Sequence, residues 1–165
     1  MVFELHRIPG HTCSSLYIEA NMKKMQAIQT VITPIDFSDN AALVVESAAY
    51  IAGTFKADLH VIFIVQNFED YSGFFVPQMS VSTIENDLYV GAEEQMDIFC
   101  RDHAGAFEQA GVTPATKVLV GDVAEKIVEY AAELEGGLIV MGTHGYKGLE
   151  RIMFGSVADQ VVKTA

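Results

Sequence analysis

The sequence predicts an α/β domain with an open, mostly parallel sheet that carries helices on both faces. Three observations predict it. Short β-branched runs alternate with longer helical patterns along the chain. The strand runs are apolar on both faces, which is typical of parallel strands covered by helices on each side. The first strand, helix and strand occupy about 40 residues, the spacing of a βαβ unit with a right-handed crossover.

The first half of the chain shows this unit most clearly. A β-branched run at 28–35 predicts a buried strand, and Ser38 and Asp39 follow it as N-cap candidates. The helix that they begin is expected at 40–55, and a second buried strand is expected at 59–65. The helical spacing predicts a buried helix face that includes Leu43, Ser47, Ala48, Ile51 and Phe55.

The second half continues the alternation after an irregular stretch. Residues 66–83 are expected to form a long loop, whose aromatic residues Tyr71, Phe74 and Phe75 could close as a lid, form a partner surface or pack back onto the domain. Packing is the preferred interpretation. The remaining elements are expected as a helix at 84–109 that ends before Gly111, a strand at 116–120, a helix at 123–134, a strand at 138–141 and a helix from 155 onward.

Length and composition predict a single globular domain. With 165 residues, half of them hydrophobic, the chain can bury one sizeable core. We expect this domain at 26–165, with 1–25 as an N-terminal extension that need not belong to the fold. The extension lacks the apolar region of a signal peptide, and the sequence has no run of about 18 apolar residues that could span a membrane. These features predict a cytoplasmic protein.

The charge balance argues against a nucleic-acid partner. Ten Lys and Arg stand against 22 Asp and Glu, for a net charge of −12, whereas nucleic-acid binding needs a basic patch that displaces counterions from phosphates. An anionic ligand would therefore depend on backbone N–H groups and helix dipoles. Cys13 and Cys100 have no motif around them and are interpreted as reduced thiols. The histidines have no ligand spacing, so no protein metal site is predicted.

Two regions are expected at the ligand-binding edge, because open α/β sheets bind ligands beyond the carboxyl ends of their strands. Asp36 directly follows the first strand, although it could also serve only the turn. The loop after the fourth strand begins with Gly142 and Gly145, which let a ligand approach the backbone but could also be simple turn residues. It ends with Gly155 and Ser156, where the N–H groups and dipole of the last helix favour a phosphate.

The spacing Gly142-x2-Gly145-x9-Gly155-Ser156 resembles the G-x2-G-x9-G-[ST] nucleotide motif of the ATP-binding universal stress proteins. The resemblance continues, in the order of that family, at 31–41, 59–65, 120–133 and 138–148. It implies a Rossmann-like fold of the adenine nucleotide alpha hydrolase-like type, with strand order 3-2-1-4-5. The family's fifth strand, which commonly builds the dimer seam, is missing before Ala165. Either the domain is C-terminally truncated relative to the family, or its homodimer forms differently.

The same resemblance implies a role for each matching residue. Pro34, Ile35 and Asp36 would line the nucleoside end of the pocket, and Ile64 would offer its backbone to the adenine of ATP. The first glycines and their neighbours would pass close to the ribose and first phosphate; these residues are Met141, Gly142, Thr143 and Gly145. The first turn of the last helix would hold the outer phosphates through Gly155, Ser156 and Val157.

One departure from the family concerns Ala158, which stands where many ATP-binding members have a second hydroxyl residue, so one phosphate contact is in doubt. Mg²⁺ or Mn²⁺ would arrive with the phosphates. The resemblance predicts a nucleotide-dependent stress-response or signalling module. His144 has no partner fixed by sequence, so ATP would be hydrolysed slowly or not at all. Two alternatives stay open: an enzyme that adenylates a small substrate, and a family member that no longer binds nucleotide and acts through dimerisation.

Overall fold

Helices and strands alternate along the chain as the sequence predicts. The computed structural model describes residues 28–66, 81–134, 137–142 and 156–165. The elements follow in the order β1 (Thr30–Pro34), α2 (Ala41–Phe55), β2 (Asp58–Val65), α3 (Val81–Asp102), α4 (Ala104–Ala110), β3 (Pro114–Val120), α5 (Val123–Glu133), β4 (Leu138–Ile139) and α6 (Ser156–Thr164). The expected extension at 1–25 and the aromatic residues of the expected loop lie outside the described residues.

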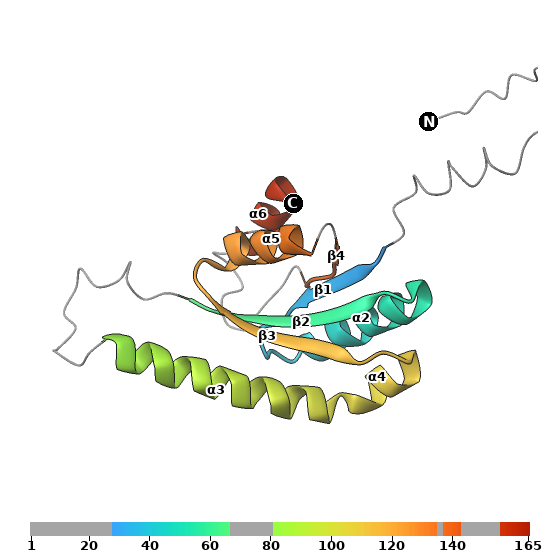
Figure 1. The fold of residues 1–165 in the computed structure, drawn as a ribbon, viewed down its shortest axis with the longest axis horizontal. Helices are drawn as coiled ribbons and strands as arrows, with labels where there is room; N and C mark the ends of the chain where they lie inside the picture. Colours follow the sequence, from blue (N-terminus) through green and yellow to red (C-terminus); the bar gives the residue numbers. More distant parts are fainter. Residues whose placement is uncertain (1–27, 67–80, 135–136, 143–155) are drawn as a thin grey trace, which may run out of the picture.

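The described strands form one parallel sheet in the order β3-β2-β1-β4, as the family order implies. β1 lies against β2 with Thr30 opposite Asp58, and β4 lies on its other side with Val31 opposite Leu138. Figure 1 shows α2, α3 and α4 on one side of the sheet and α5 and α6 on the other. The expected α/β fold with helices on both faces is therefore confirmed.

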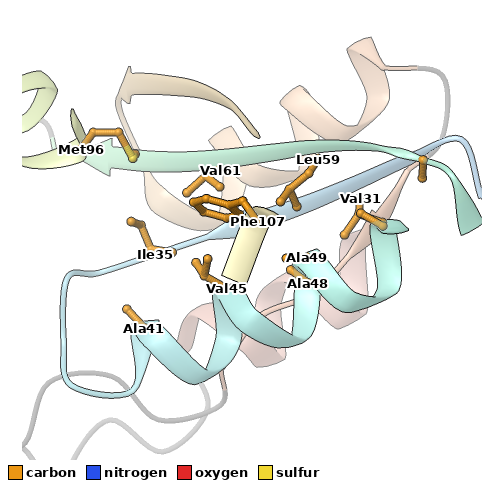
Figure 2. Close-up of a cluster of buried hydrophobic side chains, with 12 residues drawn as sticks. Val31, Ile35, Ala41, Val45, Ala48, Ala49, Leu59, Val61, Met96 and Phe107 are labelled. Atoms are coloured by element: carbon orange, nitrogen blue, oxygen red, sulfur yellow. The ribbon is translucent and has the colours of Figure 1, made fainter. Parts of the chain in front are cut away.

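Each face of the sheet has its own core, because successive side chains of β1 point to opposite faces. Val31 and Ile35 join the core under α2, which also receives Met96 from α3 and Phe107 from α4 (Figure 2). Ile32 joins the core under α5 and α6. Continuous apolar strands are thus explained by burial on both sides.

The buried face of α2 differs from the predicted one. Leu43 and Phe55 are 65% and 53% exposed. Ala48 is the one member of the predicted face that is fully buried, and the buried residues of the helix are Ala41, Val45, Ala48, Ala49 and Ala52. The helical spacing predicted the wrong face because α2 is apolar on almost every side, so hydrophobicity did not single out one buried face. The small alanines bring the α2 backbone close to the sheet.

The helix predicted at 84–109 is two helices, and α3 begins three residues earlier than expected. The break falls at His103, whose φ and ψ of −103° and 12° are not helical. The His103 Nδ1 lies 2.7 Å from the Phe99 carbonyl oxygen, and the two rings stack with centroids 4.2 Å apart. The Phe99 carbonyl also accepts the helical bond from the His103 N–H at 3.1 Å, so α3 ends just before this residue with both bonds in place. In the part of the chain that the structure describes, no helix is long and apolar enough to cross a membrane.

Candidate functional site

The sheet changes direction between β1 and β4. From β1 the chain crosses through α2 to β2, whereas from β3 it crosses through α5 back to β4 on the opposite side of β1. The carboxyl ends of these two neighbouring strands therefore lie at a topological switch point, the place where open α/β sheets bind ligands. Asp36 follows one strand end and Gly142 follows the other, so the sheet brings the two predicted regions to the same edge.

Pro34 explains why β4 is shorter than predicted. The Val140 N–H donates to the Ile32 carbonyl at 2.9 Å. The next bond of a parallel ladder would run from the amide of residue 34 to the Val140 carbonyl, but proline has no N–H to donate. Pairing ends after Leu138–Ile139 instead of extending to 141. The Val140 carbonyl and the backbone that follows it are thus not held by β1 where a ligand is expected.

The turn after β1 has an ordered geometry of its own. Asp36 is exposed, and its Oδ1 accepts a hydrogen bond from the Ser38 N–H at 3.0 Å. The Ser38 carbonyl in turn accepts from the Ala41 N–H at 2.9 Å, at the start of α2. Asp36 therefore does serve the turn, as the alternative interpretation held. A carboxylate has further acceptor sites, so this bond leaves Asp36 able to accept from a ligand as well.

Ile64 has its backbone, and not its side chain, directed along this edge of the sheet. Its side chain is 6% exposed and lies in the core under α5 and α6. The backbone groups of a strand alternate in direction, and Val65 faces β3, since its carbonyl accepts from the Gly121 N–H at 3.0 Å. The Ile64 N–H and C=O therefore face the side of β1, level with the turn that carries Asp36. This orientation is the one that its predicted role needs.

Phe37 is a residue of this turn that sequence reasoning did not single out. Its φ is 56°, in the left-handed region. The ring lies 4.6 Å from the Phe63 ring of β2 and 5.8 Å from the Phe99 ring of α3, between centroids. No sequence signal marks it, because a bulky aromatic residue is an unfavourable choice for a left-handed position.

The far side of the predicted site is described in part. Thr143, Gly145 and Gly155 lie outside the described residues, as does His144. α6 begins at Ser156, one residue after the expected start, so Val157 and Ala158 belong to its first turn and both are half-buried. Val157, Met141 and Ile64 contact one core cluster. The structure thus brings the start of α6 to the same core as the two strand ends.

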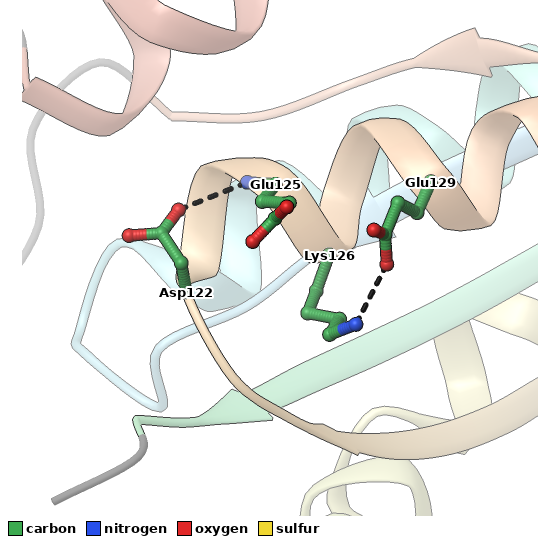
Figure 3. Close-up of polar contacts among 4 residues, drawn as sticks. All are labelled: Asp122, Glu125, Lys126 and Glu129. Atoms are coloured by element: carbon green, nitrogen blue, oxygen red, sulfur yellow. Dashed lines mark hydrogen bonds and ion pairs between the residues drawn. The ribbon is translucent and has the colours of Figure 1, made fainter. Parts of the chain in front are cut away.

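The start of α5, which follows β3, is capped by a side chain of the same helix start. The Asp122 carboxylate accepts from the Glu125 N–H at 3.0 Å, and Lys126 forms an ion pair with Glu129 at 2.7 Å (Figure 3). The Glu129 carboxylate raises the pKa of Lys126. Because Asp122 already supplies an anion at this helix end, the start of α5 is a poor place for a phosphate.

Other candidate chemistry in the described ranges lies away from this edge. A hollow of about 450 Å³ between α3 and β3 is lined by Tyr89, Glu93, Met96, Asp97, Thr116, Lys117 and Val118. Its carboxylates do not suit the anionic ligand that the motif predicts.

Within the part of the chain that the structure describes, the Cys100 thiol and the metal-ligating side chains also give no further site. Burial, and then the charge of Asp97, raise the pKa of the Cys100 thiol to about 11. In the described residues, His, Cys, Asp and Glu do not gather in threes that could hold a metal ion.

Comparison with known proteins agrees with this architecture. Residues 27–165 match the Universal stress protein family. A universal stress protein of Methanocaldococcus jannaschii is 36% identical over 136 residues, which are 82% of this chain and 76% of that protein. The solved structure of universal stress protein UspA from Lactobacillus plantarum has a TM-score of 0.66 at 24% identity and covers 84% of this chain and 92% of its own. The universal stress protein from Archaeoglobus fulgidus in complex with dAMP has a TM-score of 0.55 at 22% identity and covers 85% and 94%. The chain belongs to the universal stress protein family.

Proposed function

We propose that this universal stress protein binds ATP, accompanied by Mg²⁺ or Mn²⁺, and acts as a nucleotide-dependent stress-response module. The observation that carries the proposal is the switch point, where the β1 and β4 ends bring Asp36 and Gly142 to one edge. The glycine motif of the sequence begins at that position. A fold-level likeness alone would not support a ligand, but here a motif and a topological site coincide.

The nucleoside would bind at the β1 side of the edge. Asp36 has an exposed carboxylate whose Oδ1 is already oriented by the Ser38 N–H, which suits it to accept from a ribose hydroxyl. The backbone of Ile64 faces the same side and can pair with the edge of a base. Pro34 and Ile35, which precede the turn, would complete the wall.

The phosphates would extend toward the start of α6. Gly142 is exposed at the end of β4 and lets a ligand approach the backbone. Thr143 and Gly145 would follow it, and Gly155 to Ala158 would supply helix N–H groups. Holding phosphate without a cluster of cations is consistent with the net charge of −12.

A relative supports a nucleotide as the ligand class, since the solved protein from Archaeoglobus fulgidus contains dAMP. On the family resemblance we propose a cytoplasmic homodimer. Catalysis is not part of the proposal beyond slow ATP hydrolysis. An adenylating enzyme would need an acceptor site and would release pyrophosphate, and a member without nucleotide binding would act through dimerisation alone.

Calorimetric titration of ATP with Mg²⁺ into nucleotide-stripped protein tests the proposal. Binding should be seen in the wild type and should be lost in a Gly155→Val, Ser156→Val double variant whose circular dichroism is unchanged. Gly91→Ala is the matched control, because Gly91 is exposed on α3 with no atom within 4 Å of an added Cβ. No binding by folded wild type would overturn the proposal. Titrating ADP, AMP and dAMP in parallel ranks the preference, and a pyrophosphate assay separates the adenylation alternative.

A further inference from the structure

The turn after β1 contains a backbone conformation that its own residue disfavours. Phe37 has a φ of 56°, and left-handed geometry brings the Cβ of an L-residue too close to the following carbonyl. A bulky residue stays there only where the surroundings force it to, and such residues gather at functional sites. Phe37 directly follows Asp36, the residue to which the nucleoside is assigned.

The surroundings that force this conformation come from two other elements. The Phe37 ring packs against Phe63 at 4.6 Å with 38° between the ring planes, and against Phe99 edge-on at 5.8 Å with 68°. Phe99 is held in turn by His103, which stacks on its ring and bonds to its carbonyl. Aromatic pairs in these geometries stabilise beyond their buried area. We call the rings of Phe37, Phe63 and Phe99 the aromatic clamp.

The clamp and the Asp36 hydrogen bond are two parts of one geometry. The Ile35 N–H is fixed to the Ile62 carbonyl at 2.9 Å, and two residues later the chain must turn so that the Ser38 N–H returns to the Asp36 Oδ1. The left-handed residue lies between these two points and sets the direction of the turn. If Phe37 relaxed to an ordinary φ, the Ser38 N–H would move and the Asp36 carboxylate would lose its orientation.

We propose that Phe37 is a positioning residue of the nucleotide site, which acts through Asp36 and not by touching the ligand. The inference rests on the proposed function. The competing explanation is that Phe37 only fills the core under α2, which it also contacts. Packing alone predicts a loss of stability. Positioning predicts, in addition, a loss of nucleotide affinity that depends on Asp36 and on the backbone conformation of residue 37.

Three variants separate these explanations. Phe37→Ala removes the ring but keeps a Cβ, so the turn should relax, and ATP affinity should fall about tenfold. Phe37→Gly removes the ring and the steric penalty together, so it should regain most of that affinity although it stays less stable than the wild type, whose ring packing it lacks. In an Asp36→Ala background, Phe37→Ala should cost little further affinity, because the residue it orients is gone. Calorimetry measures affinity, and urea unfolding measures stability.

Lys56→Ala is the matched control, because Lys56 has a φ of 55° at the other end of α2, away from the site. It should leave ATP affinity unchanged. If Phe37→Ala does not fold, Phe99→Ala removes one side of the clamp and should weaken ATP binding in the same direction. The inference is overturned if Phe37→Ala binds like the wild type, if Ala and Gly lose affinity equally, or if the loss persists undiminished without Asp36. Failure of the wild type to bind would instead overturn the proposed function itself.

Discussion

The two ends of α2 contain the same unusual backbone conformation for different reasons. Phe37 and Lys56 have φ values of 56° and 55°. At Lys56 the reason is local: its N–H bonds to the Gly53 carbonyl, and the next N–H, of Ala57, bonds to the Ala52 carbonyl at 2.9 Å. This is the Schellman pattern, in which a left-handed residue lets the last carbonyls of a helix find donors.

At Phe37 there is no helix-end pattern, and the local bond that spans the residue runs from the Ser38 N–H to the Asp36 Oδ1 at 3.0 Å. The ring is held by Phe63 of β2 and Phe99 of α3, which are distant in the sequence. The comparison separates a left-handed residue that ends a helix from one that is held by packing against other elements. Lys56 ends a helix, whereas Phe37 requires the tertiary structure, and it lies beside the predicted ligand.

The largest stability effect is expected at the C-terminal end of α2, where Gly53 approaches α4. A Cβ added at Gly53 would lie 2.2 Å from the Ala110 carbonyl oxygen. Gly53→Ala should therefore force the helices apart and lower the free energy of unfolding by about 2–3 kcal/mol. Gly91→Ala is the control; it has free space and should gain about 0.5–1 kcal/mol.

Urea unfolding measures both variants, and ATP titration completes the test. If the two ends of α2 are as independent as the comparison holds, Gly53→Ala leaves ATP affinity unchanged while it remains folded. A loss of affinity as large as that of Phe37→Ala would show that any disturbance of α2 reaches the site, and the distinction between the two ends would not hold.

The sequence predicted the fold well because periodicity and turn chemistry are local. β-branched runs placed the strands, and the order of elements together with the family resemblance implied the 3-2-1-4 arrangement that the structure shows. Asp36 and Gly142 could be placed at one edge, since that follows from parallel topology. Ends of elements were less certain: the shortening of β4 depends on Pro34, a residue of another strand.

The features that sequence analysis missed depend on tertiary contacts. The buried face of α2 is chosen by close approach to the sheet and α4, so Ala52 is buried while Leu43 is exposed. The break at His103 is a change of backbone angles at a single residue, which helical periodicity does not indicate. The aromatic clamp joins residues that are far apart in the sequence, so no local sequence pattern indicates it.

A smaller effect is expected at the starts of α5 and α2, because only the start of α5 has a side-chain cap bond. The Asp122 carboxylate caps α5 by accepting from the Glu125 N–H, whereas Asn40 at the start of α2 makes no side-chain cap bond. Asp122→Ala should cost about 1 kcal/mol, and Asn40→Ala should cost much less. Urea unfolding of the two variants checks this. Equal losses would mean that the start of α2 is capped by Asn40 rather than held by the turn around Phe37.

The smallest effect on this comparison is expected at Lys56, where the substitution should stabilise the protein. Glycine adopts the left-handed conformation without a steric penalty, and the side chain of Lys56 is exposed, so Lys56→Gly should stabilise the protein by about 0.5–1 kcal/mol. For a chain of this size that raises the thermal midpoint by roughly 1–4 °C. Phe37→Gly relieves the same backbone penalty but removes a ring from the aromatic clamp, so its midpoint should fall. Scanning calorimetry of the two variants compares the two ends of α2 directly. A rise in both midpoints would mean that the backbone strain at Phe37 exceeds the stabilisation that its ring contributes to the clamp, and the clamp would then not account for the conformation of residue 37.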